Sequence, residues 1–208
     1  MASSPDPQRR AYWLKTLHTW HWISSALCLV AMILFAATGI TLNNAAHIEA
    51  KPVVTQKTAQ LPAEVLARLA RGPQEGNAPL PASVSGWLDA HLRVESAGRE
   101  AEWSRDEVYV ALPRPGGDAW LRITRDTGEL EYELTDRGWI SYFNDLHKGR
   151  NTGLAWSWFL DLFAVVCLLF CATGLLLLQL HSGNRPLTWP ITALGLVAPL
   201  LLALLFIH

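Results

Sequence analysis

Apolar residues are gathered into three long runs, at about residues 23–42, 154–180 and 187–207. At a helical rise of about 1.5 Å per residue, each run is long enough to cross a hydrocarbon core of about 30 Å. A cleaved signal peptide would have a shorter apolar centre than the first run has. The pattern therefore predicts a mainly α membrane protein with three transmembrane helices.

Residues 44–140, between the first two runs, have the mixed polar and apolar pattern of a soluble domain. Their spacing predicts two short helices, at 61–70 and 82–93, and three strands, at 107–112, 119–125 and 130–134. Turn residues separate the strands, so a three-stranded antiparallel meander is expected. The sequence thus predicts a small α+β lobe inserted between the first and second transmembrane helices.

These patterns divide the chain into six parts. They are a cytoplasmic tail at 1–11, a lead-in and first transmembrane helix at 12–43, the lobe at 44–140, a polar motif and second transmembrane helix at 141–181, a cytoplasmic loop at 182–186, and the third transmembrane helix at 187–208. Arg9, Arg10 and Lys15 precede the first span, and basic residues favour the cytoplasmic side of a membrane. We therefore expect the N-terminus in the cytoplasm and the lobe on the opposite side.

Composition narrows the classes of function. The 208 residues include 17 Lys and Arg against 18 Asp and Glu, and a net charge of −1 does not fit a basic nucleic-acid binder. No nucleic-acid partner is therefore expected. The three cysteines fall inside the apolar runs, which indicates packing positions rather than a disulfide framework.

Five of the seven histidines lie at the ends of the first two runs: His18, His21, His47, His147 and His181. The polar run Asn144–Arg150 and the apolar run after it predict one helix with His147 at one membrane face and His181 at the other. If the first two helices are antiparallel, His47 comes level with His147, and His18 and His21 come within about one turn of residues 174–181. The sequence predicts two histidine clusters, one at each face.

Paired imidazoles from facing apolar helices suit haem b, which takes one on each side of its flat macrocycle. Small residues are needed where the macrocycle rests against a helix. The similar tetrapeptides Ala37–Ile40 and Ala172–Leu175 supply Gly39 and Gly174 for this purpose. Simpler interpretations stay open, because an interfacial histidine can cap a helix and Thr-Gly pairs often serve helix packing.

Basic residues lie beside both expected clusters, where haem propionates would need them: Lys148 and Arg150 on the outer side, Lys15 and Arg185 on the inner side. One acid, Asp161, interrupts the second run about two turns from its start. A carboxylate at that depth is costly, so it is a functional candidate by default. Asp161 would relay a proton, or form a hydrogen bond to a ligand or to the first helix. A purely structural role has equal weight.

Two motifs resemble those of PepSY-associated transmembrane-helix proteins. The first is Leu17–Trp22 with the apolar run to Thr38-Gly39, and the second is Asp145–Arg150 followed by Trp156, Asp161 and Thr173-Gly174. The resemblance covers both spans and, more loosely, the lobe. His18 and His147 match the family's segment-opening histidines, and His21 belongs to the same opening motif, whereas His47 and His181 rest on the depth argument alone.

This family includes inner-membrane reductases of bacterial iron uptake, which are b-haem proteins that reduce ferric iron or ferric siderophores on the periplasmic side. The resemblance implies haem b, one or two per chain, and ferric iron or a ferric siderophore as the acceptor. It also implies a bacterial inner-membrane location with a periplasmic lobe. The chain has no flavin or nicotinamide motif, so the electron donor would be quinol or a cytoplasmic reductase.

The chain departs from the larger family members, which have a duplicated arrangement, because it has three spans and one short lobe. Two chains are therefore expected to share haem ligands in a homodimer. One alternative function is a non-enzymatic one, since PepSY-type lobes have been linked to protease inhibition. The lobe would then bind a peptide, a protease or a signalling partner while the helices anchor it. Another is an accessory to a metal-ion permease that binds iron directly through the histidines.

Overall fold

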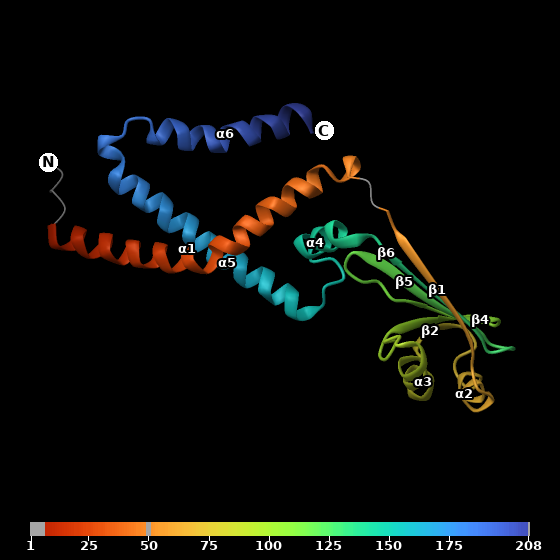
Figure 1. The fold of residues 1–208 in the computed structure, drawn as a ribbon. Helices are drawn as coiled ribbons and strands as arrows, with labels where there is room; N and C mark the ends of the chain where they lie inside the picture. The colour runs from red at the N-terminus through yellow and green to blue at the C-terminus, as the bar shows by residue number, and fades with distance from the viewer. Residues whose placement is uncertain (1–6, 49–50, 208) are drawn as a thin grey trace. The chain divides into compact units, whose positions relative to one another are not determined.

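The computed structural model describes residues 7–48 and 51–207. The chain divides into two compact units, Met1–Leu34 with Trp158–His208, and Phe35–Ser157. The first is built from long helices. The second contains the lobe together with the helix ends that adjoin it in the sequence (Figure 1).

Three helices are long and apolar enough to cross a membrane: α1 (Pro7–Asn43), α5 (Leu154–His181) and α6 (Thr188–Phe206). They confirm the predicted three-helix architecture and indicate a multi-pass membrane protein. The helix α1 begins at Pro7, earlier than the predicted lead-in, and a proline is well accommodated at the first position of a helix. Pro199 lies inside α6, as membrane helices allow.

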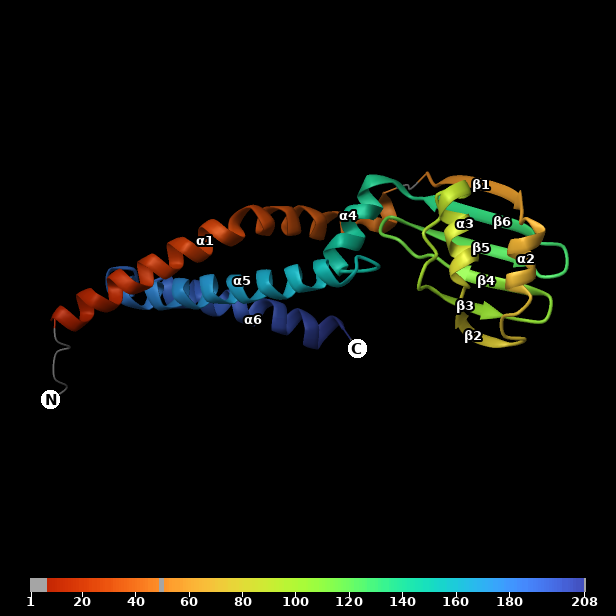
Figure 2. The ribbon, with the colours of Figure 1, turned by 90° about the horizontal axis from the view of Figure 1, so that it is seen from below.

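The lobe is a six-stranded antiparallel sheet in the order β1-β6-β5-β4-β3-β2. Its strands are β1 (Val53–Gln60), β2 (Gly76–Pro79), β3 (Glu100–Trp103), β4 (Glu107–Ala111), β5 (Gly117–Thr124) and β6 (Glu129–Asp136). The helices α2 (Ala63–Leu69) and α3 (Ala82–Leu92) lie on the same face of the sheet (Figure 2). The α+β lobe between the first two long helices is thereby confirmed.

The core lies between that face of the sheet and the two helices. Strand residues alternate between buried and exposed, as a sheet covered on one side requires, and β5 buries Ala119, Leu121 and Ile123 in this way. Leu69 of α2 and Leu88 of α3 are fully buried against them. Burial of each such side chain stabilises the fold by about 1.5–3 kcal/mol.

The other face of the sheet is polar. Arg122 on β5 donates a hydrogen bond to the Glu131 carboxylate on β6, and this contact raises the pKa of Arg122 above its ordinary value. Trp120 donates its indole N–H to Glu133 at 3.2 Å and stacks on Tyr109 of β4. Cross-strand pairs of this kind hold neighbouring strands in register.

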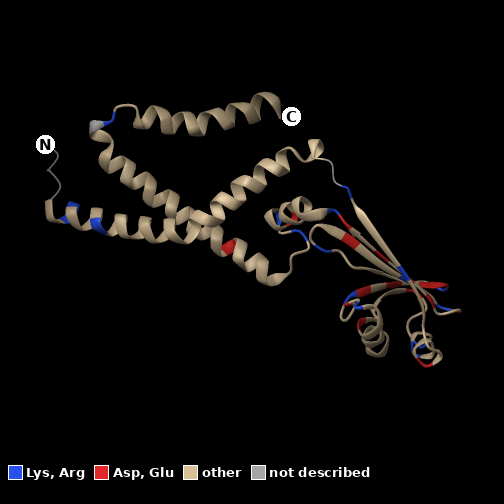
Figure 3. Cartoon of the chain, viewed as in Figure 1, with Lys and Arg blue, Asp and Glu red and all other residues tan. Residues whose placement is uncertain are grey.

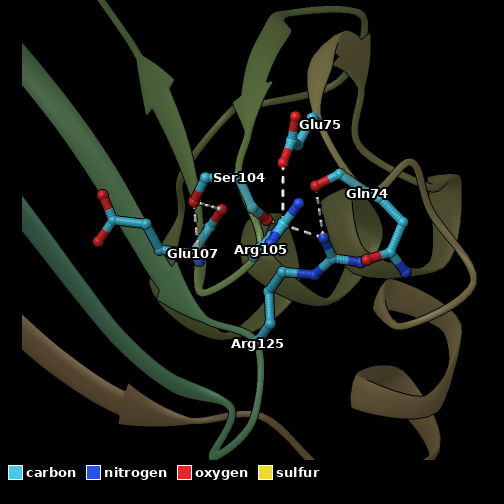
Figure 4. Close-up of polar contacts among 6 residues, drawn as sticks. All are labelled: Gln74, Glu75, Ser104, Arg105, Glu107 and Arg125. Carbon is cyan, nitrogen blue, oxygen red and sulfur yellow. Dashed lines mark hydrogen bonds and ion pairs between the residues drawn. The ribbon is translucent and has the colours of Figure 1, made fainter.

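A buried arginine joins the loops at one end of the sheet (Figure 4). Arg125 donates to the carbonyl oxygens of Ser104, at 2.8 Å, and Gln74, at 3.3 Å. Its guanidinium also lies 5.4 Å from the centroid of the Trp103 ring. Hydrogen bonds from a charged donor to buried carbonyl groups stabilise the folded state, so Arg125 is a structural residue of the lobe.

The predicted meander corresponds to β4, β5 and β6, and these strands are indeed adjacent and antiparallel. The other three strands were not predicted. The edge strand β1 is almost entirely exposed, so it lacks the alternation that marks a half-buried strand. The opposite edge strand β2 has only four residues and ends at Pro79, which gives it the composition of a turn.

The prediction that one helix carries both His147 and His181 was wrong. His147 lies on a separate helix, α4 (Gly138–Lys148), and His181 is the last residue of α5. Gly149 ends α4 in the left-handed conformation, with φ of 66°, and Arg150 N–H donates back to the Asp145 carbonyl at 2.9 Å. This is a typical C-terminal cap, and it separates the polar motif from the apolar helix that follows.

Candidate functional site

His21 on α1 fits against the segment Phe170–Gly174 of α5. Its Nδ1 lies 3.1 Å from the hydroxyl oxygen of Thr173, which is 5% exposed. The ring stacks on Phe170, with centroids 4.6 Å apart and planes inclined by 15°. A methyl group placed on Gly174 would lie 3.2 Å from Cε1 of His21. The imidazole is therefore held on three sides by α5.

His147 on α4 occupies an equivalent setting in the other unit. Its Nδ1 lies 2.6 Å from the hydroxyl oxygen of Thr38, and its ring centroid is 4.8 Å from that of Phe35. A methyl group on Gly39 would lie 3.7 Å from Cε1 of His147. All three contacting residues belong to α1, so this second imidazole is likewise fixed by a neighbouring apolar helix.

The two settings share one sequence pattern, Phe-x-Ala-Thr-Gly, at residues 35–39 and 170–174. Residues three and four apart lie on one side of a helix, so the Phe, Thr and Gly of each segment form one contact surface. That surface holds a histidine from another helix in both cases. The similarity of the tetrapeptides was noted in the sequence, but the preceding Phe and its ring contact were missed.

The threonine hydroxyls that contact the two imidazoles also bond to carbonyl oxygens of their own helices. The Thr173 hydroxyl donates to a carbonyl of its own helix, Leu169 at 2.8 Å or Phe170 at 3.0 Å, and the Thr38 hydroxyl donates to Phe35 at 3.1 Å. A hydroxyl that donates to a carbonyl accepts from the imidazole, and this arrangement corresponds to the tautomer with the proton on Nδ1. In a neutral ring Nε2 then keeps its lone pair and is available to a metal ion.

His18 and His181 form a second pair in the helical unit. Their ring centroids lie 6.0 Å apart, with planes inclined by 69°, and both side chains are exposed. The Nδ1–H of His181 donates to the Leu177 carbonyl at 2.8 Å, which again leaves Nε2 with a lone pair. Because His18 meets His181 and His21 meets Gly174, α1 and α5 run antiparallel here, and these histidines come together as predicted.

Other predicted site residues do not join these groups. His47 is exposed at the end of the short helix η1 (Ala45–His47), and no ring contact between His47 and His147 occurs in the described part of the chain. Lys148 and Arg150 are exposed beside His147, and Asp161 is exposed on α5. Charged residues are otherwise concentrated in the lobe (Figure 3). The roles of all four residues stay predictions.

The helix α4 is anchored to the lobe and to α1 by polar contacts. The Asp145 carboxylate accepts from the Gly116 backbone N–H at 2.9 Å, and buried Asn144 accepts from the Thr41 hydroxyl at 2.6 Å. The Trp156 indole N–H donates to the Leu146 carbonyl at 2.8 Å, at the C-terminal end of α4. These bonds fix the rotation of α4 and hence the direction of the His147 ring.

Axial ligation of haem b would use single imidazoles rather than a cluster of protein ligands. Within the described residues, no group of three or more His, Cys, Asp or Glu side chains is placed to hold a metal ion. Haem iron takes only one imidazole on each face. An axial histidine normally has a fixed hydrogen-bond partner at its other ring nitrogen, and Thr173 and Thr38 lie at that distance from Nδ1 of His21 and His147.

Comparison with known proteins places the chain in a family. The sequence model of a family described as "Putative PepSY_TM-like" matches residues 12–208, which include both Phe-x-Ala-Thr-Gly segments and the histidines they hold. No curated protein and no solved structure matches the chain.

Proposed function

The chain belongs to the PepSY_TM-like family, and on this premise we propose that it is a haem-b electron-transfer protein of a bacterial inner membrane. It reduces ferric iron or a ferric siderophore on the periplasmic side, where the lobe lies. The observation that carries this proposal is the repeated setting of His21 and His147, each held through Nδ1 by a threonine of an apolar helix.

The two threonines support an axial role because each lies at hydrogen-bond distance from an imidazole, as the partners of metal-binding histidines do. An accepting oxygen at Nδ1 sets the tautomer, fixes the ring's orientation and makes Nε2 a stronger electron donor. Helix packing alone would not require a histidine at either position, since an apolar side chain would fill the same space at a lower desolvation cost. His18, His47 and His181 are the further axial candidates.

Bound haem b supplies a centre that takes up and gives away one electron at a time. The protein residues would hold that centre in an apolar environment, with Gly39 and Gly174 leaving room for the imidazoles of His147 and His21. Lys148 and Arg150 are exposed near His147 and would pair with propionates. The donor is quinol or a cytoplasmic reductase, and Fe(III) takes one electron to become Fe(II), which holds hard oxygen ligands less tightly.

A homodimer forms part of this proposal. Asp161 is exposed on α5 within a candidate span, and an ionisable group facing lipid is costly. Packing of a second copy against this side of α5 would give the carboxylate a polar neighbour and would bring further histidines to a shared haem. This is also the arrangement expected of a short chain with three spans.

The reaction is tested by mixing dithionite-reduced protein, freed of excess reductant, with a ferric siderophore and following the haem absorption. The proposal predicts reoxidation of the haem with one Fe(II) formed per electron lost, trapped by a ferrous chelator. A reduced spectrum that persists with the ferric complex present, yet disappears in air, would contradict ferric reduction while leaving haem binding intact.

A second candidate function is a binding lobe that the helices anchor. A hollow of about 640 Å³ lies between α3 and the loop after it, lined among others by Ser85, Gly86 and Asp89 and by Ser96 and Arg99. The buried hydroxyl of Ser96 has no hydrogen-bond partner among the described residues. A peptide would fit a polar hollow of this kind. On this account, replacing His18 or His147 by Ala leaves both the activity and the colour unchanged.

A further inference from the structure

The helix α4 carries an apolar side that is exposed. Trp139, Ile140 and Phe143 are 75%, 46% and 47% exposed, and they occupy positions that lie together on a helix. The Trp139 ring contacts that of Phe143, with centroids 6.2 Å apart. The three residues form one continuous apolar patch on α4.

This side of α4 cannot turn inward, because the other side is already occupied. Asn144 is buried and bonded to Thr41, and the Asp145 carboxylate is bonded to the Gly116 N–H. Rotating α4 to bury Trp139 would break both contacts. Each large apolar side chain left in water forgoes the free energy of burial, so the patch is expected to be covered by something outside the chain.

Chain connectivity indicates what covers it. Only residues 149–153 separate the end of α4 at Lys148 from the start of the candidate span α5 at Leu154. The six steps from Lys148 to Leu154 reach at most about 22 Å, so the end of α4 lies within that distance of a helix that enters the bilayer. The span therefore holds α4 close to a lipid surface whatever the position of the rest of the lobe.

The residues around the patch match the chemistry of a membrane interface. Tryptophan is enriched at headgroup level, and helices that lie in the interface combine an apolar side with flanking Lys and Arg. Lys148 and Arg150 are exposed at the C-terminal end of α4. Lys51 lines a hollow of about 280 Å³ together with Trp139 and Ile140 at the N-terminal end.

We propose that α4 is an interfacial helix, lying in the headgroup region of the leaflet on the lobe's side with Trp139, Ile140 and Phe143 in lipid. The bilayer surface then fixes α4 from one side, while Asn144 and Asp145 fix it from the other. His147, near the end of α4, is held at a defined depth as a result. This inference does not depend on haem binding and survives if the proposed reduction fails.

The test uses spin labels on the full chain in nanodiscs containing anionic lipid. Cys28, Cys167 and Cys171 are replaced by Ala, and single cysteines are introduced by Phe143→Cys or Trp139→Cys. Ala97→Cys, in an exposed loop of the lobe, is the aqueous reference, and Leu168→Cys, exposed on α5, is the lipid reference. Oxygen partitions into lipid and a nickel chelate stays in water, so their ratio of collision rates reports depth.

The proposal predicts that labels at 139 and 143 collide more with oxygen than with the nickel chelate. The ratio of collision rates should resemble that of the lipid reference at 168 and differ from that of the aqueous reference at 97. A ratio equal to that at 97 would show a patch in water. Protection from both reagents would show a protein partner or a second copy covering it. Either of these two results would overturn the lipid assignment.

A second measurement keeps the native cysteines. Brominated lipids quench tryptophans that touch the bilayer, so Trp139→Phe should lower the fraction of total emission that they quench. Trp87→Phe, which removes a tryptophan of α3 in the lobe, should raise that fraction. A rise with Trp139→Phe would contradict the proposal even if the cysteine-free protein failed to fold.

Discussion

The Thr38 hydroxyl oxygen lies 2.6 Å from Nδ1 of His147, although 109 residues separate them along the chain. His21 and Thr173, which are 152 residues apart, have the same relationship at 3.1 Å. In both cases the threonine follows a phenylalanine by three residues and precedes a glycine; the phenylalanine and threonine contact the imidazole, and a methyl group on the glycine would meet it. The proposed axial roles of His21 and His147 depend on these two hydrogen bonds.

Removing the threonine hydroxyl should weaken haem binding without removing a ligand. Thr173→Val or Thr38→Val keeps the side-chain shape but deprives Nδ1–H of its acceptor. Loss of such outer partners commonly lowers metal affinity by about 10–100-fold, and a comparable loss of haem affinity is expected in a titration of apo-protein. The reduction potential should also rise, because the imidazole donates less charge to Fe(III).

Thr192→Val is the matched control for the threonine variants. The Thr192 hydroxyl donates only to the Thr188 carbonyl of its own helix, α6, and meets no histidine in the described structure. It should leave both the affinity and the potential unchanged. Unchanged values in Thr38→Val and Thr173→Val as well would show that these hydrogen bonds do not act on a ligand.

Alanine at the two glycines should give unequal effects. The new methyl would lie 3.2 Å from His21 Cε1 in Gly174→Ala but 3.7 Å from His147 Cε1 in Gly39→Ala. Both changes gain about 1 kcal/mol of helix preference, so the difference between them reports the crowding of the ring. We expect Gly174→Ala to reduce haem content per chain or shift the low-spin resonance signal, and Gly39→Ala to stay near the parent. The reverse order would contradict the geometry.

Loss of the carboxylate in α5 should weaken self-association. If Asp161 meets a polar group of a second copy, Asp161→Leu removes a contact worth about 1–2 kcal/mol, which is between about fivefold and thirtyfold in the dimer dissociation constant. Subunit exchange or fluorescence transfer between labelled copies in bilayers measures this. Leu162→Ala, at the neighbouring exposed position, is the control. A dimer tightened by Asp161→Leu would exclude a role for the acid in association.

The buried arginine of the lobe gives a prediction about stability. Arg125→Met keeps the aliphatic stem but removes the donors to Ser104 and Gln74, which should lower the free energy of unfolding of the lobe by about 1.5–3 kcal/mol. Arg105→Met breaks a pair with Glu75 whose side chains are 81% and 65% exposed, and it should change that free energy by less than about 1 kcal/mol. Urea unfolding followed by circular dichroism measures both, and an equal loss would contradict the assignment.

The spans and the central strands could be predicted because the environment of each leaves a clear pattern in its sequence. Long uncharged runs are typical of helices that cross a membrane. The residues of β4, β5 and β6 alternate between the core and the solvent. The edge strands β1 and β2 carry no such alternation, because β1 is exposed on both faces and β2 is too short to show a period. Their pairing is decided by the neighbouring strand rather than by their own residues.

The candidate site was predictable in outline but not in its partners. Antiparallel helices of known rise bring His18 and His21 to the end of α5, and the structure has them there. The depth argument could not show that Gly149 ends a separate helix carrying His147, although a glycine after a polar run is a signal for this. Phe35 and Phe170 were missed because one more aromatic residue in an apolar run is not distinctive until its ring contact is seen.

The most direct measurement is the absorption spectrum of the protein purified from haem-replete cells, with a pyridine haemochrome assay per mole of chain. The account predicts a low-spin b-type spectrum with sharp reduced bands on adding dithionite, and a lower haem content in His21→Ala and in His147→Ala but not in His91→Ala. A colourless preparation, or one whose haem content is the same in all three variants, would contradict it.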